Sequence, residues 1–331
     1  MTPLIEVKNL RKEFHVQGKK LVAIRDISLT IFKGETLGLV GESGCGKSTT
    51  GRLLLQLERA TSGEVVYEQK NLLSLNRKEL FLFRRHAQII FQDPYSSLNP
   101  RMTAGDIIAE PLRIHRSMAE GEIKNYLSTL IDKVGLSQSA LSRFPHEFSG
   151  GQRQRIGIAR ALALKPHFIV CDEPISALDV SVQAQIVNLL KDLQKELNLT
   201  YLFIAHDLAM VKYISDRVAV MYLGSIVEIA PAAELYSNPQ HPYTQALLSA
   251  IPIPDPLLER KRKPTLLTGE PSSPLALPKG CAFASRCPHA MAKCHQVQPQ
   301  ATELIPGHLV ACHLHTEEVA KKNINAKTPS R

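Results

Sequence analysis

The clearest chemistry in this sequence comes from a glycine-rich run that ends in a lysine and two hydroxyls: Gly41, Glu42, Ser43, Gly44, Cys45, Gly46, Lys47, Ser48 and Thr49. Glycines let successive backbone N–H groups turn inward around a phosphate, and the dipole of a following helix favours anions. In such a loop Lys47 reaches the β- and γ-phosphates and Ser48 ligates Mg²⁺. The run therefore predicts a site for a nucleoside triphosphate with magnesium. The alternative is a chance glycine turn before a helix.

Two adjacent carboxylates, Asp172 and Glu173, end an apolar run that begins at Phe168. Two acids at the end of a buried strand are costly unless they hold a cation or act on water. We assign Asp172 to the Mg²⁺ shell and Glu173 to the general base that polarises an attacking water. The alternative is that both acids only cap the next turn.

A third pattern, the signature motif, consists of Ser149, Gly150, Gly151 and Gln152. It offers a hydroxyl and two glycine N–H groups at the start of a helix, which is a second arrangement suited to an anion. The isolated His206 follows a short apolar strand, and a single histidine in such a place is more often structural. Neither feature identifies its ligand by itself.

The elements around these motifs alternate between strands and helices. Apolar runs predict strands at 36–40, 87–91, 168–171 and 201–205, and helical periodicity covers 47–57, 104–112, 120–134, 153–164 and 182–197. This alternation predicts a largely parallel sheet covered on both faces. We therefore expect an α/β fold, a P-loop NTPase with an antiparallel β subdomain from 4–14 and 21–32 and an inserted helical subdomain at about 95–160 that carries the signature motif.

Composition restricts the classes of protein to which the chain can belong. With 331 residues, 44% of them hydrophobic, it can build a sizeable core. No run approaches the roughly 18 to 20 apolar residues that cross a bilayer, so we expect no signal peptide and no membrane span, and a cytoplasmic location. The formal charge of +9 is scattered and only 5% of residues are aromatic, so nucleic acid is not an expected partner.

The character of the chain changes near residue 250. Seven of the 21 prolines fall between Ile251 and Gly280, which disfavours regular structure there. We predict a nucleotide-binding domain at 1–250 and a proline-rich linker at 251–280. The linker leads into a small cysteine-bearing module at 265–315, and a disordered polar tail follows at 316–331.

Taken together, the glycine-rich loop, the signature motif, the acid pair and His206 resemble the nucleotide-binding subunit of an ABC transporter. The resemblance implies an ATPase that uses ATP and Mg²⁺ and whose site closes between two subunits. Ser149, Gly150, Gly151 and Gln152 of one subunit then contact the γ-phosphate of the ATP that the other subunit holds.

The same resemblance implies roles for residues that carry no message alone. Gln92 matches the Q-loop glutamine, which contacts Mg²⁺ and the water and couples the site to the membrane subunit. His206 matches the switch histidine at the γ-phosphate, and Asp179 lies in the D-loop that crosses the dimer interface. Phe14 occupies the place of the aromatic residue, usually tyrosine, that stacks on adenine; a core phenylalanine is the competing interpretation.

Three segments narrow the resemblance to the dipeptide and oligopeptide branch of bacterial ABC importers: 91–100, 177–185 and 238–248. The resemblance covers about residues 4–313 and is closest to the second ATPase subunit. It implies a heterodimer with a related ATPase, two membrane permeases and an external solute-binding protein. The alternatives are the same role in a nickel or glutathione importer, or a non-transport ABC ATPase acting on ribosomes or DNA.

The C-terminal module carries four cysteines with gaps of five, six and seventeen residues: Cys281, Cys287, Cys294 and Cys312. The gaps are not paired zinc-finger spacings, and disulfides are disfavoured in the cytoplasm. Some members of this importer branch carry a four-iron cluster in the matching region, so the resemblance implies a [4Fe-4S] cluster. Zinc and free thiols are the alternatives, and a metal would stand in for the core that so small a module lacks.

Overall fold

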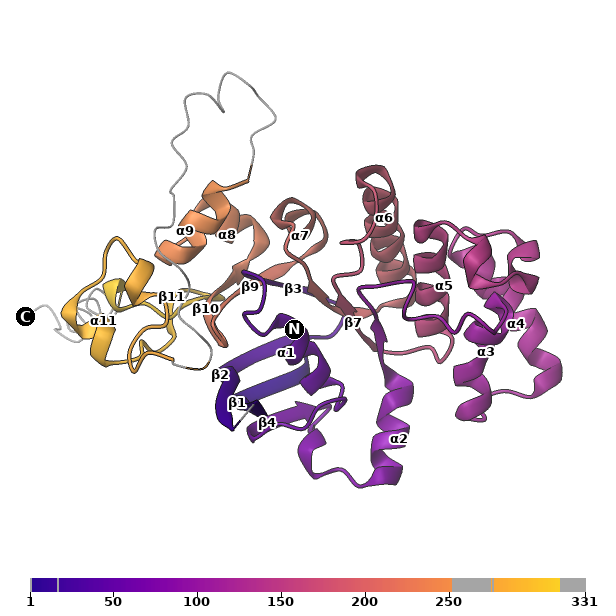
Figure 1. Cartoon of the computed structure of the whole chain (residues 1–331), viewed down its shortest axis with the longest axis horizontal. Helices are drawn as coiled ribbons and strands as arrows, with labels where there is room; N and C mark the ends of the chain where they lie inside the picture. Colours follow the sequence, from indigo (N-terminus) through magenta and orange to yellow (C-terminus); the bar gives the residue numbers. More distant parts are fainter. Residues whose placement is uncertain (1, 17, 252–274, 276, 316–331) are drawn as a thin grey trace, which may run out of the picture.

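The computed structural model describes residues 2–16, 18–251, 275 and 277–315 (Figure 1). Its strands form one sheet with the order β5-β4-β1-β2-β10-β9-β3-β8-β7-β6, to which β12 is added on β10 and β11 on β12. The strands are β1 (Pro3–Val16), β2 (Lys19–Phe32), β3 (Thr36–Val40), β4 (Ser62–Tyr67), β5 (Lys70–Asn71), β6 (Ala87–Ile90), β7 (Phe168–Asp172), β8 (Thr200–Ile204), β9 (Arg217–Tyr222), β10 (Ser225–Pro231), β11 (Thr302–Ile305) and β12 (His308–Val310).

The centre of the sheet is parallel. β8 pairs in parallel with β3 and β7, β6 pairs with β7, and β9 pairs with β3. Every residue of β3, β7 and β8 is buried, and alternate side chains enter opposite cores: Ile169 and Phe203 lie in one, Val170 and Ile204 in the other. Strands buried on both faces read as continuous apolar runs, which confirms the predicted α/β core.

Helices cover both faces of this parallel centre. They are α1 (Lys47–Leu54), α2 (Arg77–His86), α3 (Ala104–Ile114), α4 (Glu120–Lys133), α5 (Gly150–Leu162), α6 (Val180–Leu197), α7 (Leu208–Ile214), α8 (Ala232–Ser237), α9 (Pro242–Ser249) and α11 (Ala292–Gln296). Leu53 of α1 lies in the same core as Val170, whereas Leu190 of α6 lies in the core of Ile169. The inserted helical group α3–α5 gathers at one end of the molecule (Figure 1). Within the described residues, no helix combines the length and apolarity needed to cross a membrane.

The antiparallel region begins with the predicted strand pair. β1 and β2 pair from Pro3↔Phe32 to Val16↔Lys19, so both strands are longer than the sequence indicates. The connection contains Gly18 at φ 75°, a left-handed conformation that glycine adopts without the steric cost of a Cβ. β4 continues this region on the other side of β1.

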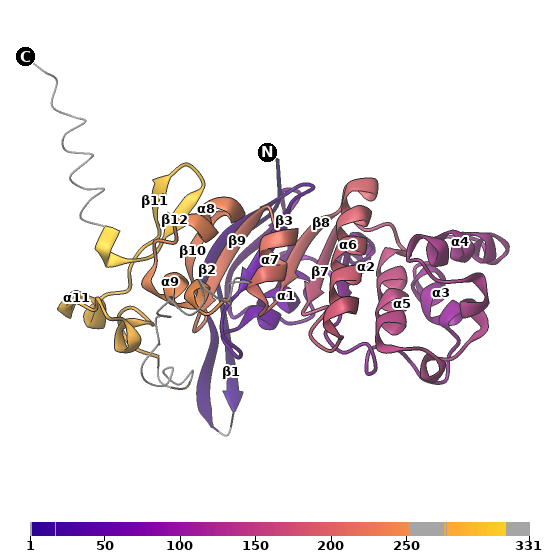
Figure 2. The same cartoon turned by 90° about the horizontal axis from the view of Figure 1, so that it is seen from above.

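The C-terminal segment 277–315 adds strands to the same sheet. β12 pairs antiparallel with β10, at Glu228↔Val310 and Ile229↔Leu309, and Figure 2 shows β11 and β12 beside β10. The Arg25 guanidinium of β2 donates to the carbonyl oxygens of this segment at 3.0 and 3.1 Å. The described part of the predicted module is therefore attached to the cassette through its backbone.

The same segment also shares a core with the rest of the chain. Phe283 is fully buried, and its ring centroid lies 5.3 Å from that of Tyr222 and 5.4 Å from that of Tyr243. A small module without a core of its own is thus stabilised here by packing against β9 and α9. Most of the predicted linker, 252–274 and 276, and the predicted tail 316–331 lie outside the described residues.

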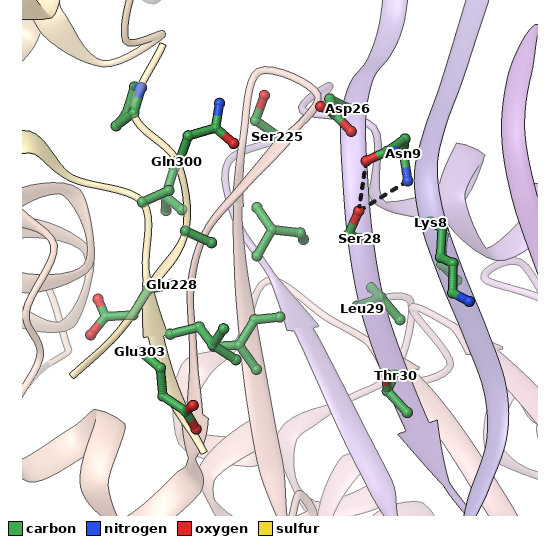
Figure 3. A pocket seen from close by; sticks show the side chains of 18 of the residues that line it. Lys8, Asn9, Asp26, Ser28, Leu29, Thr30, Ser225, Glu228, Gln300 and Glu303 are labelled. Atoms are coloured by element: carbon green, nitrogen blue, oxygen red, sulfur yellow. Dashed lines mark hydrogen bonds between the residues drawn. The ribbon is translucent and has the colours of Figure 1, made fainter. Parts of the chain in front are cut away.

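A groove of about 710 Å³ separates β2 from β10 and the C-terminal segment (Figure 3). β2 and β10 are paired at Asp26↔Ser225, and beyond that point the two strands part. The walls mix apolar side chains such as Leu29 with charged ones such as Lys8 and Glu303. The groove lies between the antiparallel region and the C-terminal segment, and the glycine-rich loop is not among its lining residues.

We expect the substitution Phe283→Ala to destabilise the whole cassette by about 3 to 5 kcal/mol, because it opens a cavity in a core shared by three elements. Denaturant unfolding of the full chain measures this loss. Val297→Ala in the same segment, where the side chain is 50% exposed, should change the free energy of unfolding by less than about 0.5 kcal/mol. Equal effects of the two substitutions would contradict the shared core.

Candidate functional site

The glycine-rich loop joins β3 to α1, and its glycines adopt the backbone conformations for which the sequence provides glycine. Gly46 caps α1 at φ 108°, and Gly41 and Gly44 also have positive φ. A Cβ on Gly46 would lie 2.6 Å from the Ala23 carbonyl oxygen, and one on Gly41 would clash with the Met221 carbonyl. Both positions therefore need glycine for conformation and for space. The loop thus presents its backbone N–H groups at a helix N-terminus, which is an anion site.

Lys47 is buried within this loop. Its ammonium donates to the carbonyl oxygens of Gly41 at 2.8 Å and Glu42 at 3.0 Å. A buried ammonium needs partners of this kind, and they hold its charge at the mouth of the loop. Its predicted contact with the β- and γ-phosphates stays a prediction.

Ser48 and Asp172 meet where β7 ends. The Ser48 hydroxyl donates to Asp172 Oδ1 at 2.7 Å. Burial raises the pKa of Asp172 above its usual range, against the hydrogen bond from Ser48. A hydroxyl and a buried carboxylate are oxygen ligands of the kind that Mg²⁺ prefers, and a cation would offset the cost of the buried charge. The two side chains therefore fit the predicted Mg²⁺ position.

Glu173, Gln92 and His206 converge beside this pair. The Gln92 amide donates to Glu173 Oε2 at 2.9 Å, and His206 Nδ1 lies 3.5 Å from the same oxygen. Glu173 adopts φ 47°, a left-handed conformation that is uncommon outside glycine, and its N–H donates to the Ile204 carbonyl at 3.0 Å. The strained backbone turns the Glu173 carboxylate toward the other two groups, which arrive from the ends of β6 and β8.

The signature motif lies at the N-terminus of α5. The Ser149 hydroxyl accepts from the Gln152 N–H at 3.3 Å, and the Gln152 side chain accepts from the Ser149 N–H at 3.0 Å. This capping box fixes the two glycines between Ser149 and Gln152. The start of α6 packs against them, because a Cβ on Gly151 would meet Val182. Asp179, which precedes α6, therefore lies nearby. In the described chain no hydrogen bond or ion pair joins these residues to the glycine-rich loop. The structure therefore does not bring the motif to the chain's own phosphate site.

Phe14 lies near the tip of the β1–β2 hairpin. Its ring is half-buried, and the Lys12 ammonium lies 4.4 Å from the ring centroid. Phe14 is absent from both apolar cores of the described chain, so the core interpretation gains no support. Its role as the adenine platform stays a prediction.

The four C-terminal cysteines gather in one region. Cys294 and Cys312 are buried, and Cys281 and Cys287 are partly buried. Burial, together with repulsion from the thiolate forms of the other three cysteines, raises the pKa of Cys312 to about 11. Over residues 2–16, 18–251, 275 and 277–315, however, no three Cys, His, Asp or Glu side chains lie at the spacing that holds a metal ion. The donor set suits a metal, while the arrangement is wider than a closed site.

The sequence did not predict the two residues that contact Glu42 of the glycine-rich loop from the C-terminal part of the chain. Arg286 contacts the Glu42 carboxylate, and the Tyr243 hydroxyl accepts from the Glu42 N–H at 3.0 Å. Arg286 lies 244 residues from Glu42 in the sequence. No local pattern signals a contact across such a separation.

A glycine-rich loop before a helix, oxygen ligands at a neighbouring strand end and a capped signature motif define an ABC-type ATPase. The family model described as ABC transporter matches residues 24–176, and the model described as the oligopeptide/dipeptide transporter C-terminal region matches residues 227–294. The chain belongs to the ATP-binding proteins of the oligopeptide and dipeptide ABC transporter family.

Relatives match nearly the whole chain. It is 57% identical to the putative oligopeptide transport ATP-binding protein YkfD of Bacillus subtilis over 97% of this chain and 98% of that protein. It is 54% identical to the oligopeptide transport ATP-binding protein OppF of Escherichia coli over 89% of this chain and 88% of that protein. Among solved structures, it is similar to the ATP-binding cassette MJ0796, a dimer bound to ADP and Pi, with a TM-score of 0.64, 29% identity and coverage of 69% of this chain and 98% of that one.

We expect Gly46→Ala to weaken nucleotide binding at least about tenfold, because the added Cβ forces the loop away from the Ala23 carbonyl and strains a positive φ. Titration with a fluorescent ATP analogue measures the dissociation constant. Gly18→Ala is the matched control, since Gly18 also has a positive φ but its Cβ would meet nothing within 4 Å. A Gly46→Ala chain that binds as tightly as the control would refute this account of the loop.

Proposed function

We propose that this chain hydrolyses Mg-ATP to drive the import of oligopeptides or dipeptides across a bacterial cytoplasmic membrane. The observation that carries the proposal is the convergence of Gln92, Glu173 and His206 beside the Ser48–Asp172 pair. Membership of the oligopeptide and dipeptide transporter family supports the peptide cargo.

Each residue has a defined task in this reaction. The loop N–H groups and Lys47 bind the phosphates, and Ser48 and Asp172 would hold a Mg²⁺ ion, which would neutralise negative charge on the phosphates. Glu173 accepts a hydrogen bond from the attacking water and takes its proton as the new P–O bond forms. The bond to the β–γ bridging oxygen breaks, and ADP and phosphate leave. Gln92 and His206 hold the Glu173 carboxylate and orient the water.

The position of the signature motif supports a two-subunit site. Ser149, Gly150, Gly151 and Gln152 lie at the N-terminus of α5 and, among the described contacts, form no hydrogen bond with the chain's own loop, so they are available to a γ-phosphate held by a partner. The partner we propose is a related ATPase, so that the pair forms a heterodimer beneath two membrane permeases. The chain then lies peripherally on the cytoplasmic face, and a periplasmic or extracellular solute-binding protein delivers the peptide.

Glu173→Gln should lower ATP turnover by about 10²- to 10⁴-fold, because the amide cannot accept the proton of the attacking water. In ATP the variant should still associate with its partner ATPase, since binding and closure do not need the base. Turnover is measured on the reconstituted complex with peptide and its solute-binding protein, and association is measured by light scattering.

The matched control for this variant is Glu64→Gln, an exposed glutamate on β4 that should leave turnover unchanged. Full turnover of a complex with the equivalent substitution in both ATPases would refute the role of Glu173. Stimulation of the unmodified complex by nickel or glutathione rather than by peptides would refute the cargo.

We also propose that Cys281, Cys287, Cys294 and Cys312 together bind a [4Fe-4S] cluster. The four thiols meet the ligand count of such a cluster, and Cys281, Cys287 and Cys294 all lie close enough to Cys312 to act on its charge. The ligands have to move closer together than in the present arrangement. The cluster has no part in the hydrolysis steps above.

Anaerobic purification should yield about four iron and four sulfide per chain and a broad visible band that dithionite bleaches. Cys312→Ser should lower the iron content, whereas Cys171→Ala should not, because Cys171 is a fully buried residue of β7. Zinc, or a folded ATP-binding chain without metal, would exclude the cluster.

A further inference from the structure

We infer that Arg286 of the C-terminal segment is a positioning residue for the phosphate loop, which it holds by neutralising and orienting Glu42. The inference rests on the proposed ATPase function and adds a residue from the cysteine-bearing segment to the support of that site. It assigns this segment a task in nucleotide binding that does not depend on its metal content.

The contact is an ion pair in which one guanidinium nitrogen donates to both carboxylate oxygens. Arg286 Nη1 lies 2.9 Å from Glu42 Oε1 and 3.0 Å from Oε2, and it also donates to the Tyr222 hydroxyl at 3.3 Å. The Arg286 side chain is only 8% exposed and that of Glu42 is 31% exposed. Pairs that are partly withdrawn from water are screened less than surface pairs, so this contact restrains the loop more than a surface ion pair would.

Glu42 is held from its backbone as well. Its N–H donates to the Tyr243 hydroxyl at 3.0 Å, and its carbonyl oxygen accepts from the Lys47 ammonium at 3.0 Å. Glu42, which pairs with Arg286, therefore also orients Lys47. If the Glu42 side chain moved, its carbonyl oxygen would move with it, and so would the Lys47 ammonium that donates to this oxygen.

The aromatic residues that pack next to Glu42 are buried. Tyr222, Tyr243 and Phe283 form a buried aromatic cluster with ring centroids 4.7 to 5.4 Å apart. The Arg286 N–H donates to the Phe283 carbonyl at 3.0 Å, so the turn that carries Arg286 is anchored to this cluster. Cys287 follows directly in the same turn, and the cysteine-bearing segment and the phosphate loop thus share one support.

Charge explains why the pair matters for ATP. Glu42 is a carboxylate in a loop that must bind a polyphosphate, and an unpaired negative charge there would repel the ligand. Arg286 cancels that charge and turns it toward the aromatic cluster. Without the arginine, the affinity for ATP should fall because of Glu42, and removing the charge of Glu42 should then restore it.

This reasoning leads to a rescue experiment on the full chain. We expect Arg286→Met to weaken binding of a fluorescent ATP analogue with Mg²⁺ about tenfold in the unmodified chain, and by less than about threefold when it is introduced into the Glu42→Gln chain. The double variant should bind like Glu42→Gln, which recovers most of the loss. A purely structural role for Arg286 would show no such recovery. Thermal unfolding of each variant shows whether folded chains are being compared. If Arg286→Met does not fold, the neutral polar substitution Arg286→Gln replaces it in the cycle.

Arg113→Met is the matched control. Arg113 forms ion pairs of similar length, 3.1 Å to Asp106 and 2.7 Å to Glu120, on the exposed surface of the helical group, and its loss should leave nucleotide affinity unchanged. Unchanged affinity in the Arg286 variant, or a double variant weaker than both single variants, would overturn the inference alone. Failure of the unmodified chain to bind Mg-ATP would overturn the proposed function and the inference with it.

Discussion

The parallel pairing of β3, β8, β7 and β6 is the constraint on which the rest of this structure depends. Because parallel strands end at the same edge of a sheet, the loop after β3, the acids at the end of β7, His206 after β8 and Gln92 after β6 are delivered to one place. The pairing Cys171↔Phe203 and Asp172↔Ile204 sets their relative height. A slip of one residue in this register would send the side chains of a whole strand to the opposite core.

The site is also supported from the far side of the sheet. β9 carries Tyr222 to the back of the phosphate loop, α9 carries Tyr243, and the C-terminal segment adds Phe283 and Arg286. The C-terminal segment, which the sequence predicts as a separate module, therefore packs directly behind the phosphate loop. Its strand β12 pairs with β10, and its Phe283 packs against Tyr222 of β9.

The chain holds two helix N-termini suited to anions that do not meet. The capped signature motif at α5 and the phosphate loop at α1 are each complete in themselves, and they belong to different parts of the molecule (Figure 1). This separation supports the proposed partner subunit, because a nucleotide bound between the two surfaces would contribute binding energy only on association.

Sequence alone determined the features that local chemistry fixes. The glycines of the loop, the acids that end a buried strand, the Ser149 cap and the alternation of strands and helices each depend on neighbours in the chain, so residue type and spacing suffice to predict them. Only the tertiary structure decided the Gln92–Glu173 contact across 81 residues, the Arg286–Glu42 pair across 244, and the sharing of one core by β9, α9 and the C-terminal segment. The physical reason is that burial and ion pairing depend on which surfaces the sheet order brings together, and that order is a property of the whole chain.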